Sequence, residues 1–317
     1  MIVTYRIHGL TVRSDLPLDA ETWPASSDVL ADIVVEQGGP IRVSDETPPG
    51  QVIADGVTSR GRFYIATSTN KGIVMRYPGL CEFVIGSDLS SIRWHLDPAS
   101  NEEFASILIS GTVLALVLIL RHELVLHASA VEVDGHAIAV VGAPGMGKST
   151  LAALIALGRG SLITDDVLRV EFLDADVVCH PAAREVRLRV SFADLNGGAS
   201  ALVRTTADGR TALHLGADHG NAVPLRSIVI PYPDPERREL LAERAPLQMA
   251  HFLLSRYPRV LGWQEPVTRR VQFQRTADLV ERVPVYRVRI PWGPPFAPEL
   301  VDQILGGVGW PAGATSR

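Results

Sequence analysis

Hydrophobic and polar positions form short strand-like stretches in the first hundred residues. Four stretches have the β-branched and aromatic composition that is typical of strands, and Pro and Gly separate them; they are residues 5–10, 31–35, 62–66 and 72–77. The pattern predicts a small β-rich N-terminal module over residues 1–100. This part of the chain has no evident chemistry of its own, so substrate recognition is the role considered for it.

An uncharged run of 17 residues, FASILISGTVLALVLIL (104–120), follows. A membrane-spanning helix requires about 20 mostly apolar residues. This run is shorter and contains two serines, a glycine and a threonine. We therefore expect a buried helix that begins near Asn101 or Ser100 and carries Glu102 and Glu103 in its first turn. Membrane association is the alternative.

Strand-like and helix-like stretches alternate after residue 122. An Asp134-Gly135 pair is typical of a hairpin turn between two strands. The pattern predicts an α/β domain over residues 101–317. Strands are expected at 123–131, 136–141, 161–172, 227–230 and 283–290, helices at 149–157, 245–257 and 298–305, and loops at 199–223.

Composition narrows the class of protein. The chain has 317 residues, 46% hydrophobic and 21% charged, which excludes global disorder. Its net charge of −5 argues against nucleic-acid binding. Cys81 and Cys179 form no C-x-x-C motif, so neither a disulfide scaffold nor a thiolate metal site is expected. With no basic and apolar leader at residues 1–20, the expected location is the cytoplasm.

The strongest chemical signal is GAPGMGKS at residues 142–149, a complete G-x-x-x-x-G-K-[ST] motif between a predicted strand and a predicted helix. In such a loop, backbone N–H groups cradle phosphate oxygens, Lys148 reaches the β- and γ-phosphates, and Ser149 binds Mg²⁺. The motif predicts binding of ATP and Mg²⁺, although it does not distinguish ATP from GTP. The expected nucleotide-binding residues are Gly142, Ala143, Pro144, Gly145, Met146, Gly147, Lys148, Ser149 and Thr150.

Two adjacent carboxylates, Asp165 and Asp166, begin 17 residues after Lys148, on the strand predicted to follow the helix. Successive side chains of a strand point to opposite faces. We therefore expect one carboxylate to face the metal and the other to face a different part of the site. The alternative is a solvated turn, which the flanking apolar residues disfavour.

Residues 126–171 resemble the catalytic core of the HPr kinase/phosphorylase family, whose phosphate loop is similar to that of phosphoenolpyruvate carboxykinase. The residues that carry the resemblance are His127, Lys148, Ser149 and the pair Asp165-Asp166. The resemblance implies an ATP- and Mg²⁺-dependent serine kinase. It implies that Asp165 is the general base, that His127 lies beside Asp165 and orients it, that Asp166 and Ser149 hold Mg²⁺, and that Lys148 stabilises charge on the transferred group.

Two departures point to a divergent branch. Thr150 stands where bifunctional HPr kinases have Glu, and the arginine signature R-G-L-G is absent. The chain resembles a branch that includes tailoring kinases for ribosomally made peptides, such as lasso peptides, which implies a peptide or small-protein acceptor and no phosphorylase activity. The family's hexamers make a homo-oligomer a candidate state.

Arg184 and Arg187 lie in the basic segment 180–195. They are candidates for binding phosphate or an acidic acceptor, because guanidinium groups pair strongly with such anions. The alternative is a solvated strand edge. Nothing in the sequence selects Arg210 or His219.

Two other functions fit the same residues. One is a nucleotide-binding regulatory module without phosphotransfer, and the other is a small-molecule kinase. No motif identifies the acceptor, so the sequence leaves all three functions open.

Overall fold

The computed structural model describes residues 2–24, 30–59, 61–174, 176–189, 195, 202–217 and 221–311. The chain has a mixed α/β fold with large sheets and forms two compact units. The first unit comprises Met1–Val125 and Pro258–Gln274, and the second comprises Leu126–Tyr257 and Arg275–Arg317. This division differs from the expected boundary at residue 100, because the apolar helix belongs to the first unit and a later segment returns to it.

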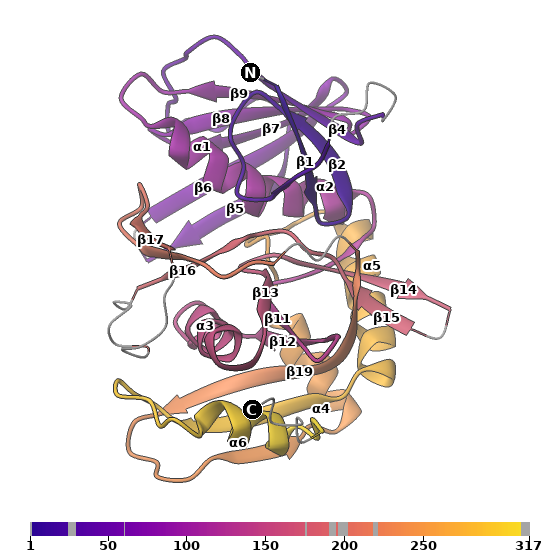
Figure 1. The fold of residues 1–317 in the computed structure, drawn as a ribbon. Helices are drawn as coiled ribbons and strands as arrows, with labels where there is room; N and C mark the ends of the chain where they lie inside the picture. Colours follow the sequence, from indigo (N-terminus) through magenta and orange to yellow (C-terminus); the bar gives the residue numbers. More distant parts are fainter. Residues whose placement is uncertain are drawn as a thin grey trace. The chain divides into compact units, whose positions relative to one another are not determined.

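The first unit contains a nine-stranded sheet in the order β3-β1-β2-β4-β9-β8-β7-β6-β5, drawn in indigo and purple in Figure 1. Its strands are β1 (Val3–Ile7), β2 (Leu10–Ser14), β3 (Glu21–Thr22), β4 (Ile33–Gln37), β5 (Gln51–Thr58), β6 (Gly61–Thr69), β7 (Gly72–Tyr77), β8 (Cys81–Gly86) and β9 (Ser91–Leu96). The single strand predicted at 5–10 is wrong. His8 and Gly9 have φ of 53° and 74° and turn the chain, so that Ile7 pairs with Leu10 in a tight hairpin.

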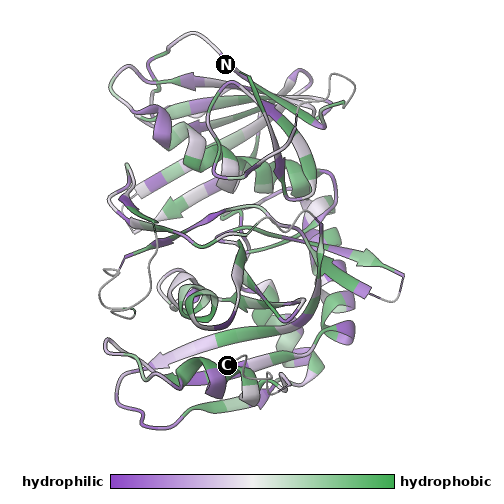
Figure 2. Cartoon of the chain, viewed as in Figure 1, coloured by the Kyte–Doolittle hydropathy of each residue, from purple (hydrophilic) through white to green (hydrophobic). Residues whose placement is uncertain are grey.

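The apolar segment forms one kinked helix made of α1 (Glu102–Leu108), a π-helical turn η1 (Ile109–Val113) and α2 (Leu114–Leu120). Of the two residues expected near its start, Asn101 caps it by accepting the N–H of Glu103. Figure 2 shows purple at the start of α1 and green along α2. By length and composition alone, this helix could cross a membrane, as could many helices in the cores of globular proteins. In this structure, 67% of its apolar stretch is buried. The expected buried helix is confirmed.

The second unit is built on a sheet in which β14, β15, β19, β12, β11 and β13 follow one another, and β21 joins β19 to β20. Its strands are β11 (Ala128–Val133), β12 (His136–Val141), β13 (Ser161–Thr164), β14 (Leu168–Leu173), β15 (Asp176–Cys179), β19 (Val223–Asp234), β20 (Leu241–Arg244) and β21 (Val285–Pro291). The boundary between the units falls within β10 (Leu124–Leu126). Strands β12, β19 and β21 are parallel, so their carboxyl ends lie at one edge.

Among the described residues there are four further helices, namely α3 (Lys148–Arg159), α4 (Leu247–Ser255), α5 (Pro266–Arg282) and α6 (Leu300–Gly307). Figure 1 shows α3 beside β11, β12 and β13. Leu151 and Ile155 of α3 pack in one buried core with Val140, Val229 and Ile304, all fully buried. This packing fixes the N-terminus of α3 against the end of β12.

A three-stranded sheet lies within the second unit, in the order β16-β18-β17. Its strands are β16 (Glu185–Leu188), β17 (Leu202–Thr205) and β18 (Thr211–His214). Loops were predicted at 199–223. That prediction is wrong for residues 202–205 and 211–214, which form β17 and β18. His219 lies outside the described residues.

Candidate functional site

The glycine-rich loop connects β12 to α3. Gly145 and Gly147 have φ of 89° and 80°, a conformation that side chains disfavour and glycine adopts freely. Gly147 is constrained further, because a Cβ at this position would overlap the indole of Trp292. The sequence therefore needs glycine at 147 for two separate reasons.

Helix α3 begins directly at the end of this loop. Gly147 is its N-terminal cap residue, and the Gly147 carbonyl accepts the N–H of Leu151. The unpaired N–H groups and the dipole of a helix N-terminus favour a bound anion such as phosphate. Lys148 is buried and folds back, so that its Nζ donates to the carbonyl of Ala143 at 3.3 Å. The Ala143 N–H in turn lies 3.0 Å from the Met146 sulfur.

Asp165 accepts hydrogen bonds from three donors. The hydroxyls of Ser149 and Ser129 donate to its Oδ1 at 2.8 and 2.6 Å, and the backbone N–H of Arg187 donates to Oδ2 at 3.1 Å. The residue is 8% exposed. Hydrogen bonds to a carboxylate are stronger than neutral ones, so these contacts hold the Asp165 carboxylate firmly against the first turn of α3.

Asp166 has a different partner. Its Oδ1 lies 3.0 Å from Nε2 of His127, and the side chains are 31% and 13% exposed, respectively. Asp166 has φ of 78°, a left-handed conformation in the break between β13 and β14. This turn directs the adjacent carboxylates to different partners. His127 directly precedes β11, Ser129 is the second residue of that strand, and each reaches one aspartate.

The structure reverses the expected pairing. We expected His127 beside Asp165 and Ser149 beside Asp166, whereas Ser149 bonds Asp165 and His127 pairs with Asp166. The aspartates also lie between two strands rather than within one, so the turn at Asp166 replaces strand alternation as the physical reason for their divergence.

The other predicted residues lie on nearby elements. Arg187 lies on β16 and contacts the site through its backbone N–H, which donates to Asp165 Oδ2. The Arg184 carbonyl accepts the N–H groups of Leu215 and Gly216 and so links the start of β16 to the end of β18. Thr150 lies in the first turn of α3.

Ser149 and Asp165 fit a magnesium site. Mg²⁺ prefers oxygen ligands and is usually held by one or two carboxylates together with substrate phosphates. The Ser149 hydroxyl and Asp165 Oδ1 meet at the helix end where phosphate is favoured. These two side chains are therefore the ones that would hold the cation.

No protein-family model matches this chain, and no curated protein matches it. Among solved structures, the chain is similar to the Hpr(Ser) kinase/phosphatase from Coxiella burnetii. The sequence identity is 13% and the TM-score is 0.30, over 58% of this chain and 93% of that one. This similarity is too distant to support a function.

Two residues near the loop were not assigned by sequence reasoning. Ser129 follows His127 by two positions, and the alternation of side chains along a strand was a signal that could have found it. Trp292 follows β21, far from the loop in sequence, and no spacing pattern connects it to Gly147.

Proposed function

We propose that this protein is an ATP- and Mg²⁺-dependent phosphotransferase that transfers the γ-phosphoryl group to a Ser hydroxyl. The observation that carries the proposal is the hydrogen bond of 2.8 Å between Ser149 and Asp165 Oδ1 at the N-terminus of α3. The next residue after Asp165 is Asp166, which pairs with His127. One pair provides oxygen ligands for the cation, and the other provides a base.

The contacts assign the two aspartates to different tasks. Asp165 is buried and its oxygens already accept from three donors, so it suits a fixed cation ligand better than a proton acceptor. Asp166 is more exposed and pairs with His127. A general base must be accessible to the acceptor and oriented by its neighbours. Asp166 is therefore the proposed base, and His127 the residue that orients it.

The proposed reaction is an in-line transfer. Asp166 takes the proton of the acceptor hydroxyl, the freed oxygen bonds to the γ-phosphorus, and the bond from that phosphorus to the β–γ bridging oxygen breaks. The products are a phosphoserine and ADP. Lys148 exchanges the Ala143 carbonyl for a γ-phosphate oxygen and stabilises the charge there. Bound Mg²⁺ supplies neutralisation of the phosphate charge.

The proposed acceptor is a peptide or small protein, including a ribosomally made lasso peptide. This choice is supported by the resemblance of residues 126–171 and by Thr150 in place of Glu. The N-terminal module is the proposed acceptor-binding part. We further propose a cytoplasmic enzyme, active as a monomer or homo-oligomer, that acts on neither nucleic acid nor membranes.

Transfer of label from γ-³²P-ATP tests the proposal. The full chain is incubated with Mg²⁺ and Ser-containing peptides, some of them ending in Ser. We expect labelled phosphoserine with the wild type and none with Asp166→Asn, which still binds ATP. Asp176→Asn is the matched control, because Asp176 is exposed at the start of β15, and it should keep full transfer.

Three results contradict the proposal. Binding of ATP with no labelled acceptor of any kind indicates a regulatory module. Label found on metabolites and never on peptides indicates a small-molecule kinase. Absence of ATP binding in the wild type shows that the loop does not hold a nucleotide.

A further inference from the structure

Trp292 stands at the edge of the sheet where the phosphate loop begins. The loop follows β12, Trp292 follows β21, and both strands run parallel to β19 between them. The backbone N–H of Trp292 donates to the backbone carbonyl of Asp234, the last residue of β19, at 3.2 Å. In α/β sheets, ligands bind outside the carboxyl ends of the parallel strands. Trp292 is therefore placed where such a ligand would lie.

An aromatic pair extends from the loop. The Trp292 indole packs against Gly147. The ring centroids of Trp292 and Phe296 are 5.3 Å apart, and the two rings meet edge to face with an interplanar angle of 89°. Both side chains are only partly buried against the core of the second unit. Trp292 therefore lies directly beside the phosphate loop, and the Phe296 ring lies next to it.

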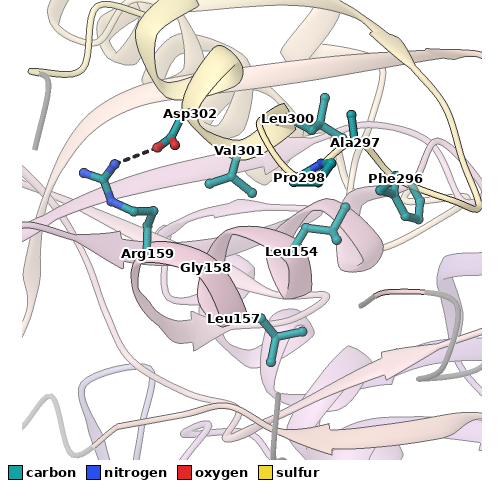
Figure 3. A pocket seen from close by; sticks show the side chains of 10 residues that line it. All are labelled: Leu154, Leu157, Gly158, Arg159, Phe296, Ala297, Pro298, Leu300, Val301 and Asp302. Atoms are coloured by element: carbon teal, nitrogen blue, oxygen red, sulfur yellow. Dashed lines mark hydrogen bonds and ion pairs between the residues drawn. The ribbon is translucent and has the colours of Figure 1, made fainter. Parts of the chain in front are cut away.

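A cavity of about 490 Å³ continues from Phe296 along α3. Figure 3 shows Leu154 of α3 pointing toward Phe296, with Val301 nearby, while Leu157 lies on the other side of the helix. An ion pair of 2.7 Å between Arg159 and Asp302 also lines it, and the dashed line in Figure 3 marks this contact. Its lining combines apolar side chains with polar groups, and its volume is within the range of small-molecule sites.

The cavity and the phosphate loop share one face of α3. Gly147, Leu154 and Gly158 are spaced by seven and four residues, which places them on one side of a helix. Leu154 lies about 10 Å along the helix from Gly147, at 1.5 Å per residue.

We infer that Trp292, Phe296 and this cavity bind the nucleoside half of the nucleotide whose phosphates occupy residues 142–149. The inference rests on the proposed function. A purine has a planar π-face that stacks on aromatic side chains. The loop thus holds the phosphates, and the aromatic pair holds the base.

Calorimetry with two ligands tests the inference, namely ATP with Mg²⁺ and inorganic triphosphate with Mg²⁺. Only ATP carries the nucleoside. We expect Trp292→Ala and Phe296→Ala each to weaken ATP binding about 10-fold, with triphosphate affinity unchanged within about twofold. Trp292→Phe should retain most of the ATP affinity, which also guards against loss of folding. The matched control is Phe252→Ala on α4, a 59% exposed ring that should affect neither ligand.

Two outcomes overturn the inference alone. If Trp292→Ala weakens ATP and triphosphate equally, the indole only supports the loop. If the wild type binds ATP no more tightly than triphosphate, the nucleoside makes no contact, although the proposed function stands. A wild type that binds neither ligand contradicts the proposed function itself, and the inference with it.

Discussion

The Ser149 hydroxyl donates to Asp165 Oδ1 at 2.8 Å, while the next residue, Asp166, turns away to His127. A single left-handed residue produces this separation. Two chemically identical side chains thereby receive different surroundings, one buried among three donors and one half-buried beside His127. The first two predictions test this difference.

Asp165→Asn and Asp166→Asn should fail in different ways. Asn at 165 removes the charge that would hold the cation, so the Mg²⁺ concentration that gives half-maximal ATP binding should rise at least about 10-fold. Asn at 166 removes the base, so kcat should fall by about 10²–10⁴ while the Kd for ATP stays within about twofold. Steady-state kinetics and Mg²⁺ titrations measure both effects. A normal Mg²⁺ requirement with lost kcat in Asp165→Asn would restore the roles implied by the sequence resemblance.

Ser129→Ala should destabilise the second unit. Ser129 is fully buried, and its hydroxyl donates to Asp165 at 2.6 Å. Loss of a buried hydrogen bond to a charged group costs about 2 kcal/mol. Ser90→Ala is the matched control, because Ser90 also donates to an aspartate at 2.6 Å but on the surface, and its free energy of unfolding should change by less than about 1 kcal/mol. Urea denaturation measures both. Equal losses would mean that burial does not strengthen the Ser129 bond.

Local patterns predicted much of the fold. The Asp134-Gly135 turn has the positive φ values of a tight hairpin, and Asn101 caps α1, because each depends on a few adjacent residues. Helix α5 was missed because few of its residues are buried, so it shows no apolar stripe. Pro266 at its first position, after Glu265 whose carboxylate accepts the N–H of Thr268, was the available signal.

The site was predictable only in part, for a related reason. The strand–loop–helix order around Lys148 follows from continuous sequence. The partners of Asp165 and Asp166 depend on the φ of Asp166 and on the positions of Ser129 and His127, which no single-sequence pattern specifies. Contact between Gly147 and Trp292 joins residues far apart in the chain.

Gly147→Ala should cost more than Gly145→Ala. Both residues have positive φ, so a methyl group strains either backbone by about 1–2 kcal/mol. Around Gly145 the space for a Cβ is open, whereas at Gly147 the Trp292 ring occupies it. We expect Gly147→Ala to displace the loop and weaken ATP binding at least about 10-fold more than Gly145→Ala does. Calorimetry and thermal unfolding measure the pair. Equal effects would show that Trp292 yields without cost.

The two cysteines should be unreactive in the folded chain. Cys81 and Cys179 are free and buried, and burial raises the pKa of each thiol to about 12. Since the thiolate is the nucleophile, a disulfide reagent at pH 8 should label neither thiol in the native chain and both in denaturant. Rapid labelling of the native chain would contradict their burial.

The same two thiols should make the free energy of unfolding depend on pH. Their pKa in the unfolded chain is near the ordinary value of 9.0, and in the folded chain it is about 12. Between these values the unfolded chain has lost the thiol protons and the folded chain has kept them. Stability is therefore fully present below pH 9 and falls as pH rises through this window, by up to about 1.4 kcal/mol per pH unit for each thiol. Denaturation of the wild type and of the double variant Cys81→Val and Cys179→Val at several pH values separates this contribution from that of buried tyrosines, whose ionisation both proteins share. Parallel pH curves for the two proteins would show that the thiols do not carry the effect.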